Sequence, residues 1–356
     1  MKIMQVIPYF CFGGAETMCE NLCYAQKSLG HDVVAVSLYN EHTPIAQRME
    51  ATGIRILYLD KKLGMDVSMV PKLLRIMKQE KPDVVHTHLD VIKYAVAAAK
   101  LCGIRHCIHT VHNVAEKEAE GLSQKINRLY YKLGWSKPVA LSPEVQHTIC
   151  QVYGLSGKNV PVIYNGIDLG KCIPKQTYVA GDQVEFLHIG RFNEQKNHVG
   201  LLHAFRMLLN RIPNCRLRLV GDGELRPEME QLAKELEIQN SVVFQGSQSD
   251  VHPFLNQADI FLLPSNYEGM PMTIIEAMAT GLPIVATCVG GVPDMVENEV
   301  SALLVPCNTE AICAACERLA ENAVLREKLG KASMERSPAF SAAQMAKQYC
   351  ELYEQN

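Results

Sequence analysis

One stretch of this chain reads Tyr267-Glu268-Gly269-Met270-Pro271-Met272-Thr273-Ile274-Ile275-Glu276-Ala277-Met278, and a short apolar run at 260–263 precedes it. The apolar run is typical of a buried strand, and Pro271 suits the first position of a helix. Gly281 suits the residue that follows a helix. The stretch therefore predicts a strand, a connecting loop and a helix in that order.

Short β-branched runs alternate with helical patterns on both sides of this unit. The strand candidates are 3–7, 33–38, 54–59, 84–86, 107–110 and 139–141 in the first half, and 185–189, 216–220, 242–244, 260–263, 284–286 and 302–305 in the second. Strands that alternate with helices of this length form parallel α/β sheets. Aperiodic stretches at 168–175 and 180–182 predict a linker between the halves.

The pattern predicts an α/β protein with two doubly wound, Rossmann-like domains that face each other across a cleft. Ligands of such sheets bind beyond the carboxyl ends of the strands, so the cleft is the expected active site. The length of 356 residues agrees with two domains of ordinary size.

Composition excludes several classes of protein. The formal net charge is −3 and 48% of the residues are hydrophobic, so we expect neither a disordered chain nor a nucleic-acid partner. The thirteen cysteines lie largely in apolar runs, as reduced thiols do. No apolar stretch is long enough to span a membrane, and the first residues do not suggest a signal peptide. We therefore expect a cytoplasmic protein.

Two loops carry charges suited to a phosphorylated sugar. Glu268 and Glu276 flank a helix start whose backbone N–H groups favour anionic oxygens, so the two carboxylates need another partner, such as sugar hydroxyls. Arg191 and Lys196 lie in the loop after the first strand of the second half, where two cations can neutralise a diphosphate leaving group. The alternatives are a solvated surface glutamate and a solvated loop.

Gly13 and Gly14 follow the first strand and open a helix. They let backbone N–H groups approach a bound anion, although the same glycines could form a turn that only clears space. The pattern is not the G-x-G-x-x-G of NAD-binding domains.

These segments, in this order, resemble the retaining nucleotide-sugar glycosyltransferases of family four, which have the GT-B fold. The resemblance covers nearly the whole chain. Its motifs are Gly13-Gly14-Ala15-Glu16, His109-Thr110-Val111-His112-Asn113, Val162-Ile163-Tyr164-Asn165-Gly166-Ile167-Asp168, Gly190-Arg191 with Lys196, Leu219-Val220-Gly221-Asp222-Gly223, Tyr267-Glu268-Gly269 to Glu276-Ala277-Met278, and Gly290-Gly291-Val292-Pro293-Asp294.

The resemblance implies a role for each matching residue. The implied catalytic residues are His112, Glu268, Arg191 and Lys196. The implied donor-binding residues are Gly13, Gly14, Arg191, Lys196, Glu268, Gly269, Met270, Pro271 and Glu276. Arg191 and Lys196 would hold the diphosphate, Glu276 the ribose hydroxyls and Glu268 the hydroxyls of the transferred sugar. Met270 and Pro271 depart from the commoner family sequence, which makes the identity of that sugar less predictable.

The implied activity is transfer of a sugar from a nucleotide diphosphate donor, by default a uridine one, to an acceptor hydroxyl with retention of configuration. We expect no metal and no cofactor, and a role in cell-surface polysaccharide or glycolipid synthesis. Residues 1–170 would form the N-terminal acceptor-side domain, with a C-terminal helix at 339–356 crossing back to it, and residues 181–338 the nucleotide-sugar-binding domain. A non-hydrolysing nucleotide-sugar epimerase of the same fold and an inactive sugar-nucleotide-binding module are the alternatives.

Other patterns have simpler interpretations. His86-Thr87-His88, His106, His109 and His112 could suggest zinc, but we interpret them as polar lining or substrate contacts beside the cleft. Cys313 and Cys316 form a lone C-x-x-C in a helical stretch, typical of buried thiols.

The segment 122–137 is both basic and apolar and has no acidic residue. Such a helix suits an anionic membrane surface, which would make the protein peripheral at the inner face of the membrane. It also suits an ordinary amphipathic helix packed on the first domain, and the sequence leaves both open.

Overall fold

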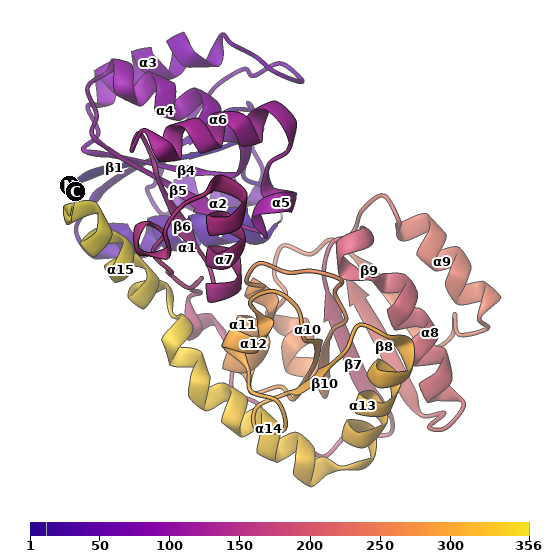
Figure 1. Ribbon diagram of the computed structural model, residues 1–356. Coiled ribbons are helices and arrows are strands. Elements are labelled where there is room, and N and C mark those ends of the chain that lie inside the picture. The colour runs from indigo at the N-terminus through magenta and orange to yellow at the C-terminus, as the bar shows by residue number, and fades with distance from the viewer. Residues whose placement is uncertain (12, 356) are drawn as a thin grey trace. The chain divides into compact units, whose positions relative to one another are not determined.

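The computed structural model describes residues 1–11 and 13–355, which form two compact units. The first unit comprises residues 1–167 and 341–356, and the second comprises residues 168–340. Figure 1 shows the course of the chain through both.

The first unit is a six-stranded parallel sheet in the order β3-β2-β1-β4-β5-β6. Its strands are β1 (Lys2–Ile7), β2 (Asp32–Ser37), β3 (Arg55–Tyr58), β4 (Val84–His88), β5 (His106–Val111) and β6 (Lys137–Ala140). Its helices are α1 (Gly14–Ser28), α2 (Pro44–Ala51), α3 (Met69–Glu80), α4 (Ile92–Leu101), α5 (Ala115–Glu118), α6 (Gly121–Lys132), α7 (Pro143–Tyr153) and α15 (Ala342–Glu354). Helices cover both faces of the sheet, and each face has its own apolar core beneath the helices.

The end of the chain belongs to the first unit. Ser341 bridges to Ile167, and the backbone N–H of Ala342 donates to the Ile167 carbonyl at 2.8 Å. The helix α15 then packs against α1 and buries Tyr349 and Tyr353. A C-terminal helix thereby supplies part of the core of an N-terminal sheet.

The second unit repeats the same topology, with the strand order β12-β11-β10-β7-β8-β9. Its strands are β7 (Val184–Ile189), β8 (Cys215–Val220), β9 (Val242–Gly246), β10 (Ile260–Leu263), β11 (Ile284–Thr287) and β12 (Leu303–Val305). Its helices are α8 (His198–Leu209), α9 (Arg226–Glu235), α10 (His252–Gln257), α11 (Met272–Thr280), α12 (Val292–Met295), α13 (Thr309–Glu321) and α14 (Ala323–Arg336). The prediction of two doubly wound, Rossmann-like domains is confirmed.

Two local predictions were wrong. Pro271 precedes α11 in an extended conformation, with φ −71° and ψ 121°, and is not its first residue. Its carbonyl accepts a hydrogen bond from the Ile274 N–H at 3.2 Å, so Pro271 is the N-cap residue and the helix begins at Met272. The segment 122–137 is not one helix, since α6 ends at Lys132 and Gly134 has a φ of +64°.

The structure has no helix, within its described residues, that is long and apolar enough to cross a membrane.

Candidate active site

The charged loops of the second unit border the point at which its strand order reverses. The chain runs from β7 outward to β9 on one side, and from β10 outward to β12 on the other. The loops that follow β7 and β10 therefore lie next to each other at the carboxyl edge of the sheet. This is the position at which doubly wound sheets bind their ligands.

Lys196 and Glu268 meet across these two loops. Lys196 ends a 3-10 helix at 194–196, and its Nζ donates to Glu268 Oε1 at 2.6 Å. Gln195 Nε2 donates to the other carboxylate oxygen at 3.3 Å. The Glu268 side chain is only 4% exposed, so its charge requires the lysine beside it. Sequence reasoning assigned these two residues to different parts of a donor and did not anticipate that they pair, and it missed Gln195.

Glycines bring the backbones of the site loops together. Gly290 has a φ of +53°, and a Cβ at this position would overlap the carbonyl oxygen of Glu268. Gly221 has a φ of +138°, and a Cβ there would overlap the carbonyl oxygen of Gly190. Because only glycine tolerates both the backbone conformation and the close approach, these two positions fix the spacing of the loops.

Glu276 lies in the second turn of α11 without a hydrogen-bond partner for its carboxyl group among the described residues. Burial raises the pKa of this carboxyl to about 7, and the negative charge of Asp250 adds to the effect. The first turn of α11 has no acidic residue, and Met270 and Pro271 before it are buried. The start of α11 therefore has no acidic side chain in its first turn to repel an anion, and Glu276 can accept hydrogen bonds from hydroxyl groups.

Arg191 is exposed in the same loop as Lys196. The second unit therefore holds Arg191, Lys196, Glu268 and Glu276 on its own carboxyl edge. Of these four residues, Lys196 and Glu268 are brought into direct contact.

The first unit holds the remaining predicted residues. Gly14 begins α1, and Gly13 caps it without a side-chain hydrogen bond. The first turn of α1 also contains the buried carboxylate of Glu16, whose negative charge opposes an anion at this helix start. Phe12, next to this motif, lies outside the described residues.

His112 directly follows β5 at the carboxyl edge of the first sheet. Its Nε2 lies 3.0 Å from His88 Nδ1, and burial lowers the pKa of His112 to about 3. Sequence reasoning missed Glu118: burial raises the pKa of its carboxyl to about 7, and the nearby backbone N–H groups of His112 and Asn113 oppose that rise. The signal in the sequence that could have identified Glu118 was an acidic residue shortly after the end of a strand.

The interpretation of the other histidines as cleft lining was wrong. His86, His88 and His109 are completely buried and are hydrogen-bonded inside the first unit. The part of the chain that the structure describes contains no group of three or more His, Cys, Asp or Glu residues arranged to hold a metal.

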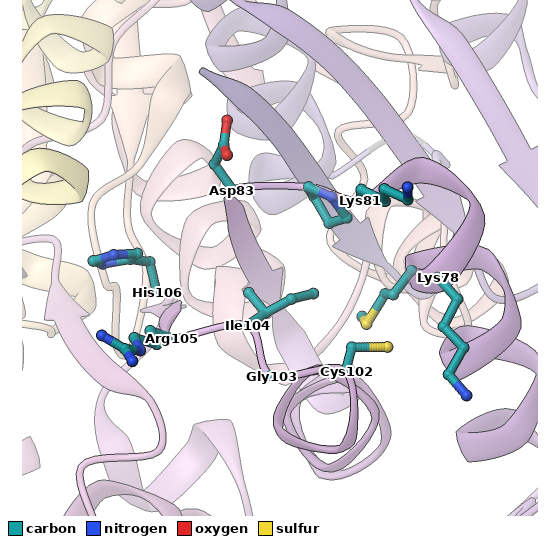
Figure 2. A pocket seen from close by; sticks show the side chains of 10 residues that line it. Lys78, Lys81, Asp83, Cys102, Gly103, Ile104, Arg105 and His106 are labelled. Atoms are coloured by element: carbon teal, nitrogen blue, oxygen red, sulfur yellow. The ribbon is translucent and has the colours of Figure 1, made fainter.

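A pocket of about 460 Å³ opens at the opposite, amino edge of the first sheet (Figure 2). Lys78 and Lys81 approach it from α3 and the turn after it, and Arg105 comes from the residues before β5. His106, the first residue of β5, also lines this pocket, whereas His112 at the other end of β5 and the remaining predicted catalytic and donor-binding residues do not.

Two family models match the chain in succession. The model described as "Glycosyltransferase Family 4" matches residues 12–171, and the one described as "Glycosyl transferases group 1" matches residues 173–336. Together they account for every residue from 12 to 336 except residue 172.

Curated relatives and solved structures agree with the family models. An Escherichia coli UDP-Gal:alpha-D-GlcNAc-diphosphoundecaprenol alpha-1,3-galactosyltransferase is 29% identical over 73% of this chain and 72% of its own length. A Bacillus anthracis N-acetyl-alpha-D-glucosaminyl L-malate synthase is 26% identical over 65% of this chain and 64% of its own. The crystal structure of Anabaena Alr3699/HepE in complex with UDP-glucose covers 100% of both chains with a TM-score of 0.86 at 20% identity, which shows the shared fold.

Two sheets of Rossmann-like strand order, each with charged or polar residues at its carboxyl edge, thus coincide with two consecutive family matches. The chain belongs to glycosyltransferase family four and is a glycosyltransferase of the GT-B fold.

Proposed function

We propose that this enzyme transfers a sugar from a uridine diphosphate sugar to an acceptor hydroxyl, with retention of the anomeric configuration. The juxtaposition of Lys196 and Glu268 beside the start of α11 carries the proposal. A diphosphate needs cations and N–H groups, and a sugar needs hydroxyl acceptors. The second unit has both kinds of group at the strand-order reversal where such ligands bind.

The ion pair explains how the Glu268 carboxylate can be buried. A buried carboxylate without a cation would cost several kcal/mol, and the attraction of Lys196 offsets part of that cost. We propose that Lys196 and Arg191 bind the diphosphate and that Glu268 binds hydroxyls of the transferred sugar. Lys196 would then lie between two negative partners.

Glu276 would bind the ribose. Its carboxyl group has no hydrogen-bond partner among the described residues, and burial raises its pKa. Hydroxyl donors favour the ionised form and would supply the missing partners. The uridine base follows from similarity, since the E. coli relative is named for UDP-Gal and the Anabaena structure contains UDP-glucose.

In the proposed reaction the bond between the sugar anomeric carbon and the phosphate oxygen breaks, and the acceptor oxygen forms a bond to the same face of that carbon. The acceptor hydroxyl proton passes to the departing diphosphate. The role of Arg191 and Lys196 would be to stabilise the charge that develops on the diphosphate. In this proposal the chain acts without a metal or cofactor, and Gly14 and His112 contribute from the first unit.

Named relatives support an acceptor in cell-surface synthesis. They include the E. coli diphosphoundecaprenol enzyme and a Rhizobium meliloti protein named for lipopolysaccharide core biosynthesis. We propose a lipid-linked or polysaccharide acceptor for this enzyme as well.

The binding test is calorimetric titration of the full chain with UDP. Lys196→Ala and Glu276→Ala should each weaken UDP binding about ten- to hundredfold, the worth of a charge-assisted hydrogen bond. The matched control is Lys175→Ala. Lys175 forms a similarly buried ion pair with Asp259 at 3.5 Å. Asp259 directly precedes β10, so this pair lies at the opposite edge of the same sheet from Lys196 and Glu268. Unchanged affinity in both site variants would contradict the proposal.

The activity test is product analysis after a screen of UDP-glucose and UDP-galactose against hydroxyl acceptors. Proton NMR of the product would give the anomeric configuration, and retention is the expected result. A sugar isomer that appears without any acceptor would instead indicate an epimerase.

We also propose that the first unit contacts an anionic membrane surface through α6 and the turn after it. Leu122, Leu129 and Leu133 are each more than half exposed, and Trp135 is 37% exposed. Exposed basic residues accompany them at Lys125, Arg128 and Lys132. A surface that is both apolar and basic binds anionic headgroups and inserts its apolar side chains among them.

Flotation with vesicles of phosphatidylglycerol and phosphatidylcholine tests this part. The wild-type chain should float at low salt, and the double variant Leu129→Glu with Leu133→Glu should not. Both leucines are exposed, so the variant should keep its fold. Absence of wild-type binding at low salt would rule the membrane contact out.

A further inference from the structure

A continuous chain of buried hydrogen bonds crosses the interior of the first unit. It runs from His112 to His88, Gln5, Gln26, Tyr353, His86, Thr110 and Tyr349 in that order. The donor-to-acceptor distances lie between 2.7 and 3.1 Å. Every member except His112 is almost completely buried. His112 is therefore the end of the chain that can reach a ligand.

The two glutamines set the direction of the chain. Gln5 Nε2 donates to Gln26 Oε1 at 2.9 Å, which leaves Gln5 Oε1 as the acceptor toward His88 Nε2 at 2.8 Å. An amide oxygen cannot donate, so the hydrogen of His88 is on Nε2. A neutral imidazole carries a single N–H, so His88 Nδ1 accepts a hydrogen bond from His112 Nε2.

The other half of the chain has the same direction. Gln26 Nε2 donates to the Tyr353 hydroxyl at 3.1 Å, and that hydroxyl then donates to His86 Nδ1 at 2.7 Å. His86 consequently carries its hydrogen on Nε2 and donates to Thr110, which can donate to Tyr349. Each group gives one hydrogen to the next, so no member conflicts with the direction set by the glutamines.

Burial keeps the histidines of this chain neutral. It lowers the pKa of His86 and of His88 well below the ordinary value, and that of His112 to about 3. At neutral pH each ring therefore has one N–H and one bare nitrogen.

We propose that His88 is a positioning residue that fixes His112 as its Nε2–H tautomer, so that His112 Nδ1 accepts a hydrogen bond from a hydroxyl of the bound sugar. His112 Nδ1 has no hydrogen-bond partner within the described part of the chain. His112 also directly follows β5, at the edge of the sheet where ligands bind. The contact with a sugar rests on the proposed function, whereas the tautomer does not.

The first experiment measures the tautomer in the unliganded full chain by long-range ¹H–¹⁵N correlation of the imidazole rings at neutral pH. His112→Gln assigns the signal. We expect the Nε2–H form in the wild type and a mixture of both tautomers in His88→Leu. His88→Asn keeps an acceptor oxygen near the position of Nδ1 and should retain the Nε2–H form.

The matched control is His109→Leu. His109 is as deeply buried as His88 and bonds to Thr87 at 2.9 Å, but it lies outside the chain. The His109→Leu variant should leave the His112 tautomer unchanged. An Nδ1–H tautomer in the wild type would overturn the proposal, as would a tautomer unaffected by His88→Leu. If His88→Leu does not fold, a mixture of tautomers in His88→Asn would overturn it instead.

The second experiment compares UDP with UDP-glucose by calorimetry. His88→Leu should weaken UDP-glucose binding about three- to tenfold, the value of one hydrogen bond, and leave UDP binding unchanged. His88→Asn should restore most of the loss. Equal weakening of both ligands would contradict a role toward the sugar. If the wild type binds neither ligand, the proposed function fails, and the tautomer measurement still decides the role of His88.

Discussion

Replacing Glu276 with glutamine should stabilise the unliganded enzyme at alkaline pH. Burial raises the pKa of this carboxyl from an ordinary 4.5 to about 7. At 1.36 kcal/mol per pKa unit, ionised Glu276 costs up to ~3 kcal/mol in the folded state. The residue keeps partial exposure, which reduces the cost, so we expect a gain of about 2 kcal/mol for Glu276→Gln at pH 8.

The gain should depend on pH with a definite sign. An acid whose pKa is higher in the folded state binds more protons there between pH 4.5 and 7, so wild-type stability falls as the pH rises through this range. Above pH 7 both states are ionised and the full cost remains. The advantage of the glutamine variant should therefore be nearly complete at pH 8 and fall to about a quarter of that value at pH 5.

Scanning calorimetry of the full chain at pH 5 and pH 8 is the assay. The single tryptophan, Trp135, lies in the first unit and does not report on the unit that contains Glu276. A gain of 1 kcal/mol raises the melting temperature of a domain of this size by about 2–4 °C. Glu299→Gln is the control with the opposite sign, because Arg318 lowers the pKa of Glu299. Equal melting temperatures at pH 8, or a gain of the same size at pH 5, would refute the reasoning.

The same contacts support three further predictions. If Glu276 must ionise to bind the ribose, UDP binding should release about one proton at pH 6 and almost none at pH 8, which titrations in buffers of different ionisation heat would detect. Glu268→Gln should free Lys196 from its ion pair, so that calorimetry shows tighter UDP binding but weaker UDP-glucose binding; parallel changes would count against the assignment. Tyr353→Phe leaves two buried partners unsatisfied, whereas Tyr349→Phe removes one hydrogen bond at the end of the buried chain. Chemical denaturation should therefore show a loss of unfolding free energy of about 2–3 kcal/mol for Tyr353→Phe and ~1 kcal/mol for Tyr349→Phe. The reverse order would contradict the hydrogen-bond connectivity.

The strand and helix pattern was predictable because the apolar residues that become buried recur at regular spacings along the chain. The run at 260–263 coincides with β10, and Gly281 ends α11 with a φ of +76°, as its position after the last periodic residue predicts. The end of α6 could also have been predicted, since Gly134 interrupts the segment. The basic and apolar pattern continues past that glycine, and for that reason it suggested a longer helix.

The contacts between distant residues were not predictable in this way. Lys196 and Glu268 are 72 positions apart, and only the neighbouring places of β7 and β10 in the sheet bring them together. The connection from His86 to Tyr353 spans 267 positions. Gln5 in the middle of a buried strand was a local sign that a polar network lies inside the first sheet.

The two sheets agree in strand order but have different groups at their carboxyl edges. The second sheet has the lysine and arginine that a diphosphate requires, whereas His112 on the first is kept neutral by burial. Breaking a glycosidic bond places positive charge on the sugar ring in the transition state. An imidazolium near the ring would oppose that charge, and a neutral nitrogen that accepts a hydrogen bond does not. The buried chain from Tyr349 to His112 would therefore present an oriented acceptor to the sugar without adding a positive charge.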